Sequence, residues 1–176
     1  IGRRGYDLAL CSRSLESLER AREILAVQVP DATVFVAACD VSDPAQVETF
    51  VAEAIEQLGP IEVAVHVAGI IQVGPWEATT HEHFRQALDV MLWGPVNLAL
   101  AVVPGMTARG HGRFGVVGSV GGVVSPPRLL PYSVAKYGAS GLVEGLAAEL
   151  AGTGVTATLL VPGLMRTGSH TAATFY

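Results

Sequence analysis

The sequence contains little of what several classes of protein require. It has two cysteines, Cys11 and Cys39, in 176 residues, which is too few for a disulfide framework. No run of about 18 apolar residues appears, so we expect no transmembrane helix and no membrane partner. No basic segment followed by an apolar stretch opens the chain, so no signal peptide is expected. These features together predict a cytoplasmic protein in which both thiols are buried and free.

Charge is also scarce. Only 15% of the residues are charged and the formal net charge is −5, which argues against a nucleic-acid partner. Half of the residues are hydrophobic, which is enough apolar material for a sizeable core. The length predicts one domain that occupies residues 1–176.

No metal-ligand cluster is apparent among the histidines. His81 and His83 stand two positions apart, so on a helix they would point to different sides. The remaining three histidines are scattered, and no cysteine or acid completes a ligand set. We therefore expect no metal site.

Apolar runs of strand length alternate with segments of helical periodicity. This alternation predicts a parallel sheet with helices on both faces. The expected strands are residues 6–11, 33–38, 61–67, 113–119 and 155–161. The expected helices are residues 12–27, a helix capped by Ser42 that runs to 58, a long helix from about 80 to 108 that bends near Gly94-Pro95, and 131–151.

Candidate catalytic residues lie between Gly118 and Lys136. Tyr132 and Lys136 are four apart, so on a helix both side chains lie on one face, one turn apart. An ammonium close to a phenol favours the phenolate, as general acid–base catalysis by a tyrosine requires. Ser119 ends the expected strand 113–119, at the sheet edge where open α/β folds bind ligands.

These residues resemble the signature of the short-chain dehydrogenases/reductases, in which a serine precedes Tyr-x-x-x-Lys by about a dozen residues. Tyr-x-x-x-Lys by itself is common and fits a solvated surface helix equally well. Ser119, however, precedes Tyr132 by 13 positions. Three further segments also resemble family elements: Cys39-Asp40-Val41, Ala68-Gly69, and the run from Pro162-Gly163 to Thr167.

The resemblance implies a Rossmann-like, doubly wound fold and an NAD(P)-dependent oxidoreductase. The substrate would be a small molecule carrying a carbonyl or an alcohol. Tyr132 would be the acid–base, Ser119 would hydrogen-bond the substrate oxygen, and Lys136 would bind the nicotinamide ribose. The further residues expected at the cofactor are Arg13, Asp40, Val41, Ala68, Gly69, Pro162, Gly163 and Thr167.

Cofactor choice depends on Arg13. The residue just past the second family strand faces the adenosine ribose, where an acid suits the 2′-hydroxyl of NAD and an arginine suits a 2′-phosphate. Ser12-Arg13 without an acid therefore favours NADP over NAD. The alternative is a solvated arginine at a helix start, just as Asp40 could be a simple loop acid.

Two positions depart from the family pattern. Val67 replaces the second asparagine of Asn-Asn-Ala-Gly, so a hydrogen bond that steadies the sheet is lost. Met91 replaces the asparagine of an Asn-x-x-Gly stretch that holds a water in the proton relay, and a thioether accepts a hydrogen bond poorly. Either the relay runs through backbone and water, or catalysis is weak.

The family's first strand and its glycine-rich turn, Thr-Gly-x-x-x-Gly-x-Gly, have no match in this sequence. Together with the end of the chain soon after Thr167, this suggests a member truncated at both ends. Two alternatives to an active enzyme therefore stay open: a non-catalytic nucleotide-binding or scaffolding relative, and a non-functional fragment.

The resemblance also implies a homodimer or homotetramer when full length, built on the helices at about 80–108 and 131–151. The substrate pocket would be formed by loops near residues 70–80, 120–130 and beyond 167. The identity of the substrate is not encoded in any motif of this sequence.

Overall fold

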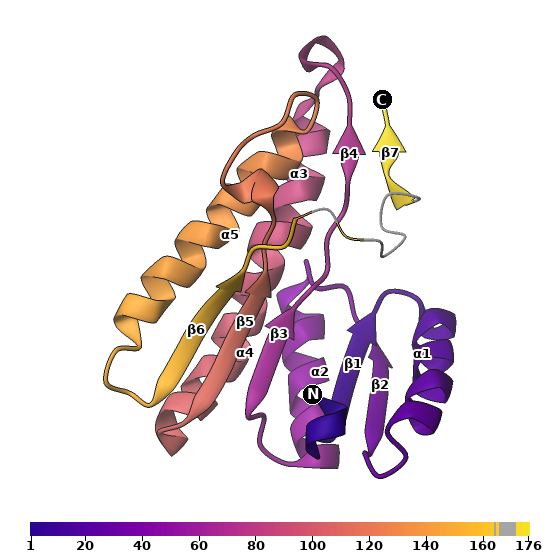
Figure 1. The fold of residues 1–176 in the computed structure, drawn as a ribbon, viewed down its shortest axis with the longest axis vertical. Helices are drawn as coiled ribbons and strands as arrows, with labels where there is room; N and C mark the ends of the chain where they lie inside the picture. Colours follow the sequence, from indigo (N-terminus) through magenta and orange to yellow (C-terminus); the bar gives the residue numbers. More distant parts are fainter. Residues whose placement is uncertain (164, 166–171) are drawn as a thin grey trace.

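The computed structural model describes residues 1–163, 165 and 172–176, and its strands and helices alternate as an α/β fold (Figure 1). The five longer strands are β1 (Leu8–Ser12), β2 (Val34–Ala38), β3 (Val63–His66), β5 (Gly112–Val117) and β6 (Val155–Leu160). The helices are α1 (Leu15–Gln28), α2 (Pro44–Leu58), α3 (His81–Leu88), α4 (Gly94–Arg109) and α5 (Leu130–Glu149). The predicted α/β class is confirmed.

Strand pairing divides the sheet into two parts. β1 pairs in parallel with β2, and β5 lies between β3 and β6, again with every pair parallel. Among the described residues no strand pairing joins β1 to β3, and the two ribbons are separated in the view of Figure 1. The link between the two parts is made by helices instead, since α2 packs on β1 and β2 and also against α4.

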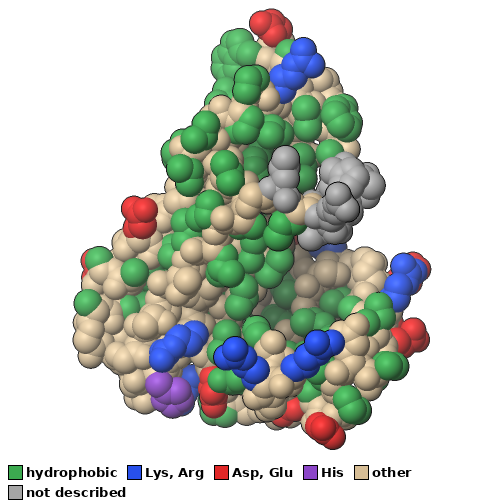
Figure 2. All heavy atoms as spheres, in the orientation of Figure 1, with side chains coloured by type: hydrophobic (Ala, Val, Ile, Leu, Met, Phe, Trp, Pro, Cys, Tyr) green, Lys and Arg blue, Asp and Glu red, His purple; other side chains and the backbone are tan. Residues whose placement is uncertain are grey.

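The core lies between β3–β5–β6 and the helices packed on one of its faces. Phe114 and Val116 of β5 are buried against Val102 and Met106 of α4 and Val143 of α5. Side chains of the opposite face are more exposed, among them Val65, Val67 and Leu160. Figure 2 shows hydrophobic side chains over this part of the molecule. The described helices therefore cover β3–β5–β6 mainly from one side.

The helix α2 begins differently from our expectation. Asp43 is its N-cap, accepting hydrogen bonds from the backbone N–H groups of Ala45 and Gln46, and Pro44 occupies the first turn. Ser42 instead donates its hydroxyl to Asp40. The assignment of the cap to Ser42 was wrong. Serine and aspartate are both good N-cap residues, and Pro44, which suits the first helical position, makes the preceding Asp43 the cap.

The long helix expected from about 80 to 108 is present but changes its hydrogen-bond register. α3 passes through a π-helical turn, Asp89–Trp93, into α4. The N–H of Gly94 bonds to the carbonyl of Asp89, five residues back. Pro95 has no N–H to offer the carbonyl of Met91, which accounts for an interruption at this point. The interruption thus lies in the turn just before Gly94-Pro95.

By length and apolar composition the helical run His81–Arg109 could cross a membrane. Core helices of soluble proteins pass the same test, and this one buries Val102 and Met106 in the domain core. The run is accounted for by its place in the fold.

Two strands of two residues each were not predicted. β4 (Gln72–Val73) and β7 (Thr174–Phe175) pair in parallel near the N-terminal end of α3 (Figure 1). Elements this short carry no periodicity that a sequence pattern could reveal. Their pairing brings the end of the described chain beside the segment that follows β3.

We predict that the chain of 176 residues, expressed by itself, has low stability and binds NADPH poorly. β1 and β3 each have one edge with which no described strand pairs, and each buried backbone group without a partner costs about 1 to 3 kcal/mol. A domain has only about 5 to 15 kcal/mol in total. Thermal denaturation with and without NADPH measures this. A cooperative transition that rises by several degrees with NADPH would contradict the prediction.

Candidate active site

The candidate residues gather where β3 and β5 end. Ser119 follows β5 and forms the N-cap of a short 3-10 helix, Val120–Gly122. Its Oγ accepts a hydrogen bond from the backbone N–H of Gly121 at 3.0 Å. Because that bond uses an oxygen lone pair, the hydroxyl hydrogen of Ser119 is left to donate to another group.

Lys136 is the most deeply buried of the candidate catalytic side chains. It is 5% exposed, and its Nζ donates to the carbonyl of Val117, the last residue of β5, at 2.9 Å. Burial lowers the pKa of Lys136 to about 8, since a desolvated ammonium is disfavoured. The Nζ lies 5.8 Å from the centroid of the Tyr132 ring, within the range of a cation–π interaction.

Two glycines allow α5 to approach the Ser119 turn closely. A Cβ on Gly121 would lie 2.8 Å from Cε1 of Tyr132 and 3.5 Å from Oγ of Ser119, so Gly121 sits between these two side chains. A Cβ on Gly122 would lie 2.9 Å from the carbonyl oxygen of Lys136. The glycine pair is thus the element that lets Ser119, Tyr132 and Lys136 share one site.

Met91 lies in the π-helical turn and is 1% exposed. Its sulfur is 3.5 Å from the position that a Cβ on Gly69 would occupy, and the Nζ of Lys136 is 3.9 Å from the same point. Met91 also forms a small buried cluster with Ala87 and Ala135, against which Tyr132 packs. The methionine therefore borders the site, and it supplies packing where an asparagine would supply hydrogen bonds.

His66 is a buried polar residue of the site that the sequence analysis left aside with the scattered histidines. It ends β3, is 3% exposed, and its Nε2 has no hydrogen-bond partner among the described residues. Burial lowers its pKa to about 4, the positive charge of Lys136 acts in the same direction, and a hydrogen bond to the backbone of Val90 opposes them. The Nε2 lies against Gly94, where a Cβ would approach it to 2.7 Å. The signal in the sequence was a histidine that ends an apolar strand.

Arg13 and Asp40 follow the neighbouring strands β1 and β2. The hydroxyl and the backbone N–H of Ser42 both donate hydrogen bonds to Oδ1 of Asp40, at 2.7 and 3.0 Å respectively. These hydrogen bonds hold the pKa of Asp40 below its usual range, and the charge of Arg13 contributes further. Arg13 itself is exposed. Asp40 therefore stabilises its own loop, and the cationic side chain of Arg13 stays accessible beside it.

Val41 is tied to α4 through an asparagine that no motif indicated. Nδ2 of Asn97 donates to the carbonyl of Val41 at 3.0 Å. The Val41 side chain also packs against Gly94, at 3.1 Å from the position of a Cβ there. Asn97 thus connects the loop after β2 to the helix that passes behind the candidate site.

Pro162 and Gly163 lie beside the Ser119 turn. The backbone N–H of Val120 donates to the carbonyl of Pro162 at 3.3 Å, just after the bond from Gly118 to Leu160. Gly163 is exposed, with open space where a Cβ would stand. Thr167 lies outside the described residues. Two of the three residues expected near the carboxamide are therefore brought to the site.

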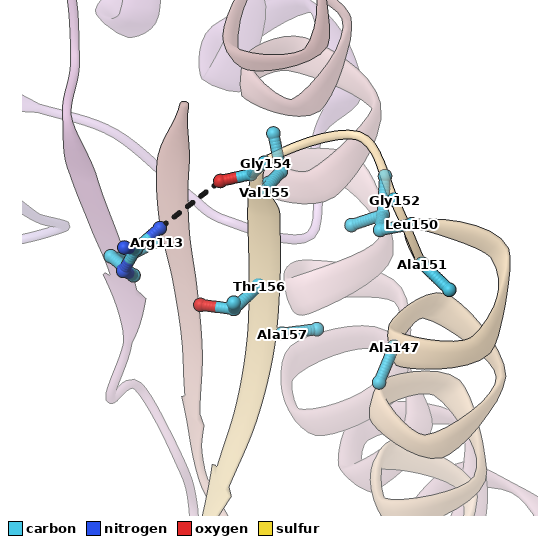
Figure 3. Close-up of a pocket in the computed structure, with 9 residues that line it drawn as sticks. All are labelled: Arg113, Ala147, Leu150, Ala151, Gly152, Gly154, Val155, Thr156 and Ala157. Carbon is cyan, nitrogen blue, oxygen red and sulfur yellow. Dashed lines mark hydrogen bonds between the residues drawn. The ribbon is translucent and has the colours of Figure 1, made fainter. Parts of the chain in front are cut away.

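A separate hollow of about 380 Å³ lies at the opposite end of β5 and β6 (Figure 3). Ala147, Gly152 and Val155 are among its lining residues, and Arg113 donates across one side to the carbonyl of Gly154 at 3.2 Å. None of the candidate catalytic residues lines it. We assign no function to this hollow, because it lies away from the candidate catalytic residues.

Comparison with known proteins gives a consistent result. The profile of the family described as short chain dehydrogenase matches residues 1–174. A putative ketoacyl reductase of Streptomyces coelicolor is 30% identical over 172 residues, which are 95% of this chain and 64% of that protein. The chain spans only part of its curated relatives, 58% of an uncharacterized oxidoreductase of Bacillus subtilis among them.

Two solved structures illustrate the similarity of fold. An alcohol dehydrogenase from the archaeon Thermococcus sibiricus, complexed with 5-hydroxy-NADP, superposes with a TM-score of 0.88 at 28% identity, over 98% of this chain and 72% of that one. A short chain dehydrogenase/reductase from Burkholderia phymatum, in complex with NAD, gives a TM-score of 0.88 at 26% identity, over 94% and 59%. Folds of this kind are thus found with either nucleotide.

We predict that His66 makes the complete protein less stable in mild acid. The unfolded chain takes up a proton near pH 6.5, whereas folded His66 does so only near pH 4. The free energy of unfolding that His66 contributes above pH 6.5 is therefore lost as the pH falls toward 4. The loss amounts to about 2 kcal/mol between pH 7.5 and 5. His66→Asn should remove this part of the pH dependence in urea unfolding.

The exposed residue His81 provides the control for this measurement. The control is the same substitution at this exposed position, His81→Asn, measured under the same conditions. An identical slope in His66→Asn would show that His66 titrates as if it were exposed.

Proposed function

The chain belongs to the short-chain dehydrogenase family, and from this premise we propose that the whole protein is an NADP-dependent oxidoreductase that interconverts a carbonyl and an alcohol. The observation that carries the proposal is the convergence of Ser119, Tyr132 and Lys136 around Gly121 and Gly122. The substrate is a small molecule, since acid–base and hydrogen-bonding groups meet at one sheet edge.

Tyr132 is the proposed acid–base. During reduction its hydroxyl protonates the carbonyl oxygen, and during oxidation the phenolate accepts the proton of the alcohol. The hydroxyl of Ser119 donates a hydrogen bond to the same oxygen, because its hydrogen is not used in the bond that Oγ accepts from Gly121. The two groups together hold and polarise the carbonyl.

Lys136 is the proposed electrostatic partner of Tyr132. With a pKa of about 8, about nine-tenths of Lys136 carries its charge at pH 7. That charge lies 5.8 Å from the centroid of the Tyr132 ring, where it can offset the negative charge that develops on the phenol oxygen during proton transfer. One donor of the ammonium is used by Val117, which leaves two for the ribose hydroxyls of a cofactor.

The residues present suit a nicotinamide dinucleotide. Gly69 is exposed beside the Nζ of Lys136, and Gly163 offers open space next to the Ser119 turn. Ala68, Pro162 and Thr167 complete the proposed nicotinamide side, whereas Asp40 and Val41 lie on the adenine side. When bound, the cofactor supplies the hydride, and the protein supplies orientation and electrostatics.

The preference for NADP rests on Arg13. Its exposed guanidinium follows β1 and suits a 2′-phosphate, with which it can form charge-assisted hydrogen bonds. Asp40 is an acid whose carboxylate interacts with the charge of Arg13. Its Oδ1 already accepts two hydrogen bonds from Ser42, which makes it a poorer partner for a ribose hydroxyl.

A non-catalytic nucleotide-binding protein is the second candidate, and a non-functional fragment is the third. Met91 supports them, because its thioether borders Lys136 without offering a hydrogen-bond donor. Against them, Pro95 cannot donate to the carbonyl of Met91, so this carbonyl lacks the donor that a regular α-helix would give it at the position of the missing asparagine. A relay through this carbonyl and water keeps the enzymatic proposal viable.

Assembly as a homodimer or homotetramer and a cytoplasmic location belong to the same proposal. Val143 of α5 and Leu150, the C-cap residue of that helix, are used in the domain core. Leu100 of α4 and Val134 and Tyr137 of α5 remain exposed and supply apolar surface for a second copy. The free thiols of Cys11 and Cys39 suit a reducing compartment.

We predict that Tyr132→Phe in the complete protein abolishes turnover and leaves NADPH affinity nearly unchanged, because only the proton donor is deleted. Ethyl acetoacetate is a suitable probe, since one relative is named as a ketoacyl reductase. Oxidation of NADPH is followed by absorbance, and NADPH affinity by fluorescence. Reduction at a near wild-type rate by Tyr132→Phe would show that another group donates the proton.

We also predict that the unmutated protein prefers NADPH over NADH, and that Arg13→Ala reduces this preference. Loss of a charge-assisted contact to a phosphate should change the affinity ratio by about one to two orders of magnitude. The ratio is obtained from the dissociation constants of both cofactors. Arg22, on the same half of the chain but paired with Glu19, gives the control variant Arg22→Ala. Equal affinities in the unmutated protein would refute the role of Arg13.

A further inference from the structure

Tyr176 occupies a close-fitting seat made by Gly74, Thr79 and His83. A Cβ on Gly74 would lie 2.3 Å from Cε2 of the Tyr176 ring and 2.7 Å from its carbonyl oxygen. A side chain at position 74 and Tyr176 in its observed place are therefore mutually exclusive. This contact requires glycine for lack of space, not for backbone conformation.

The Tyr176 side chain makes two further contacts in this seat. Its ring stacks on the imidazole of His83, with centroids 3.7 Å apart and planes inclined by 21°. Its hydroxyl lies 3.3 Å from Oγ1 of Thr79. His83 is itself held in place, because its Nδ1 accepts a hydrogen bond from the backbone N–H of Thr80 at the start of α3. The seat is thus built on a capped helix.

The backbone around Tyr176 forms the β4–β7 ladder. Thr174 donates to the carbonyl of Ile71 at 2.9 Å, and Tyr176 donates to that of Val73 at 3.1 Å. A ladder of two residues on each strand is marginal by itself. Phe175 adds little, since it is 75% exposed. The side-chain contacts of Tyr176, which is half-buried, are therefore what keeps β7 against β4.

The other end of this arrangement reaches the candidate catalytic residues. Ile70, just before β4, packs against the buried cluster of Ala87, Met91 and Ala135, as does Tyr132. Just after β4, the N–H of Gly74 donates to the carbonyl of Arg128 at 3.0 Å, in the loop between Ser119 and α5. The segment that contains β4 thus connects the buried cluster on which Tyr132 packs with the seat of Tyr176.

We propose that Tyr176 is a positioning residue for the substrate side of the active site: seated on Gly74, Thr79 and His83, it fixes β7 along β4 and so sets the wall beside Tyr132. The inference rests on the proposed function for its substrate role. The existence of the seat does not depend on that function and is tested separately.

The test uses the complete protein and the variant Tyr176→Ala, with Phe175→Ala as the matched control on the same strand. Amide hydrogen exchange at Thr174 reports the ladder, and we expect it to accelerate at least about tenfold in Tyr176→Ala only. The KM for ethyl acetoacetate should rise by about five- to tenfold, with kcat and NADPH affinity changed less than about twofold. Tyr176→Phe, which keeps the stacked ring, should retain most of the wild-type KM.

A second variant tests the seat from its opposite side. Gly74→Ala adds one methyl group that collides with Tyr176, so it should reproduce the faster exchange at Thr174 and the raised KM. Gly141→Ala in α5 is the control, because nothing lies within 4 Å of the added methyl there.

The outcomes separate the seat from the proposed function. Unchanged exchange at Thr174 in both Tyr176→Ala and Gly74→Ala would overturn the inference. Faster exchange with an unchanged KM would also overturn it, since the seat would then be structural only. If even the unmutated protein fails to reduce ethyl acetoacetate or any ketone of a small panel, the proposed function fails and the substrate role with it, while the exchange data still decide whether the seat exists.

Discussion

The hydrogen bond from Lys136 to the carbonyl of Val117 is the contact on which the candidate site depends. It joins the first turns of α5 to the last residue of β5, and it is made by a side chain almost removed from solvent. An ammonium in such a place is costly, and the lowered pKa expresses that cost. The fold therefore keeps a charge beside Tyr132 at the expense of some stability, as catalytic sites commonly do.

The same burial affects His66. With the charge of Lys136 nearby and no partner for Nε2 in the described part of the chain, the lowered pKa of His66 favours the neutral imidazole. Gly94 and the π-helical turn close around it, and Met91 fills the space on the Gly69 side. Where an asparagine would bring a hydrogen-bonding amide, this chain has apolar packing around one buried histidine and one buried lysine. The polarity of the site is therefore concentrated in few groups, and the charge of Lys136 acts on His66 in the same direction as burial does.

The sequence was sufficient for features that have a period or a spacing. The strands and helices of five residues or more were predicted to within a few residues, because each carries an apolar pattern. Ser119, Tyr132 and Lys136 were selected by spacing, and the structure brings them to one sheet edge. Contacts made by short or isolated elements were beyond prediction: the pairing of β4 with β7, the bond from Asn97 to Val41, and the role of Asp43 in place of Ser42. These depend on which surfaces meet in three dimensions, and no local pattern encodes that.

The division of the sheet determines which contacts connect the two ends of the proposed dinucleotide site. Arg13 and Asp40 follow the strands β1 and β2, whereas Ser119 and Gly69 follow β5 and β3, and no described strand pairing joins the two sets. The connection runs instead through the packing of α2 on α4 and through Asn97, which holds Val41. Helix packing of this kind tolerates small shifts better than a continuous ladder does. A ligand that contacts both sets binds most tightly when the two sets are aligned. Its binding therefore stabilises the aligned arrangement, by the difference between its binding free energies to the aligned and the misaligned arrangement.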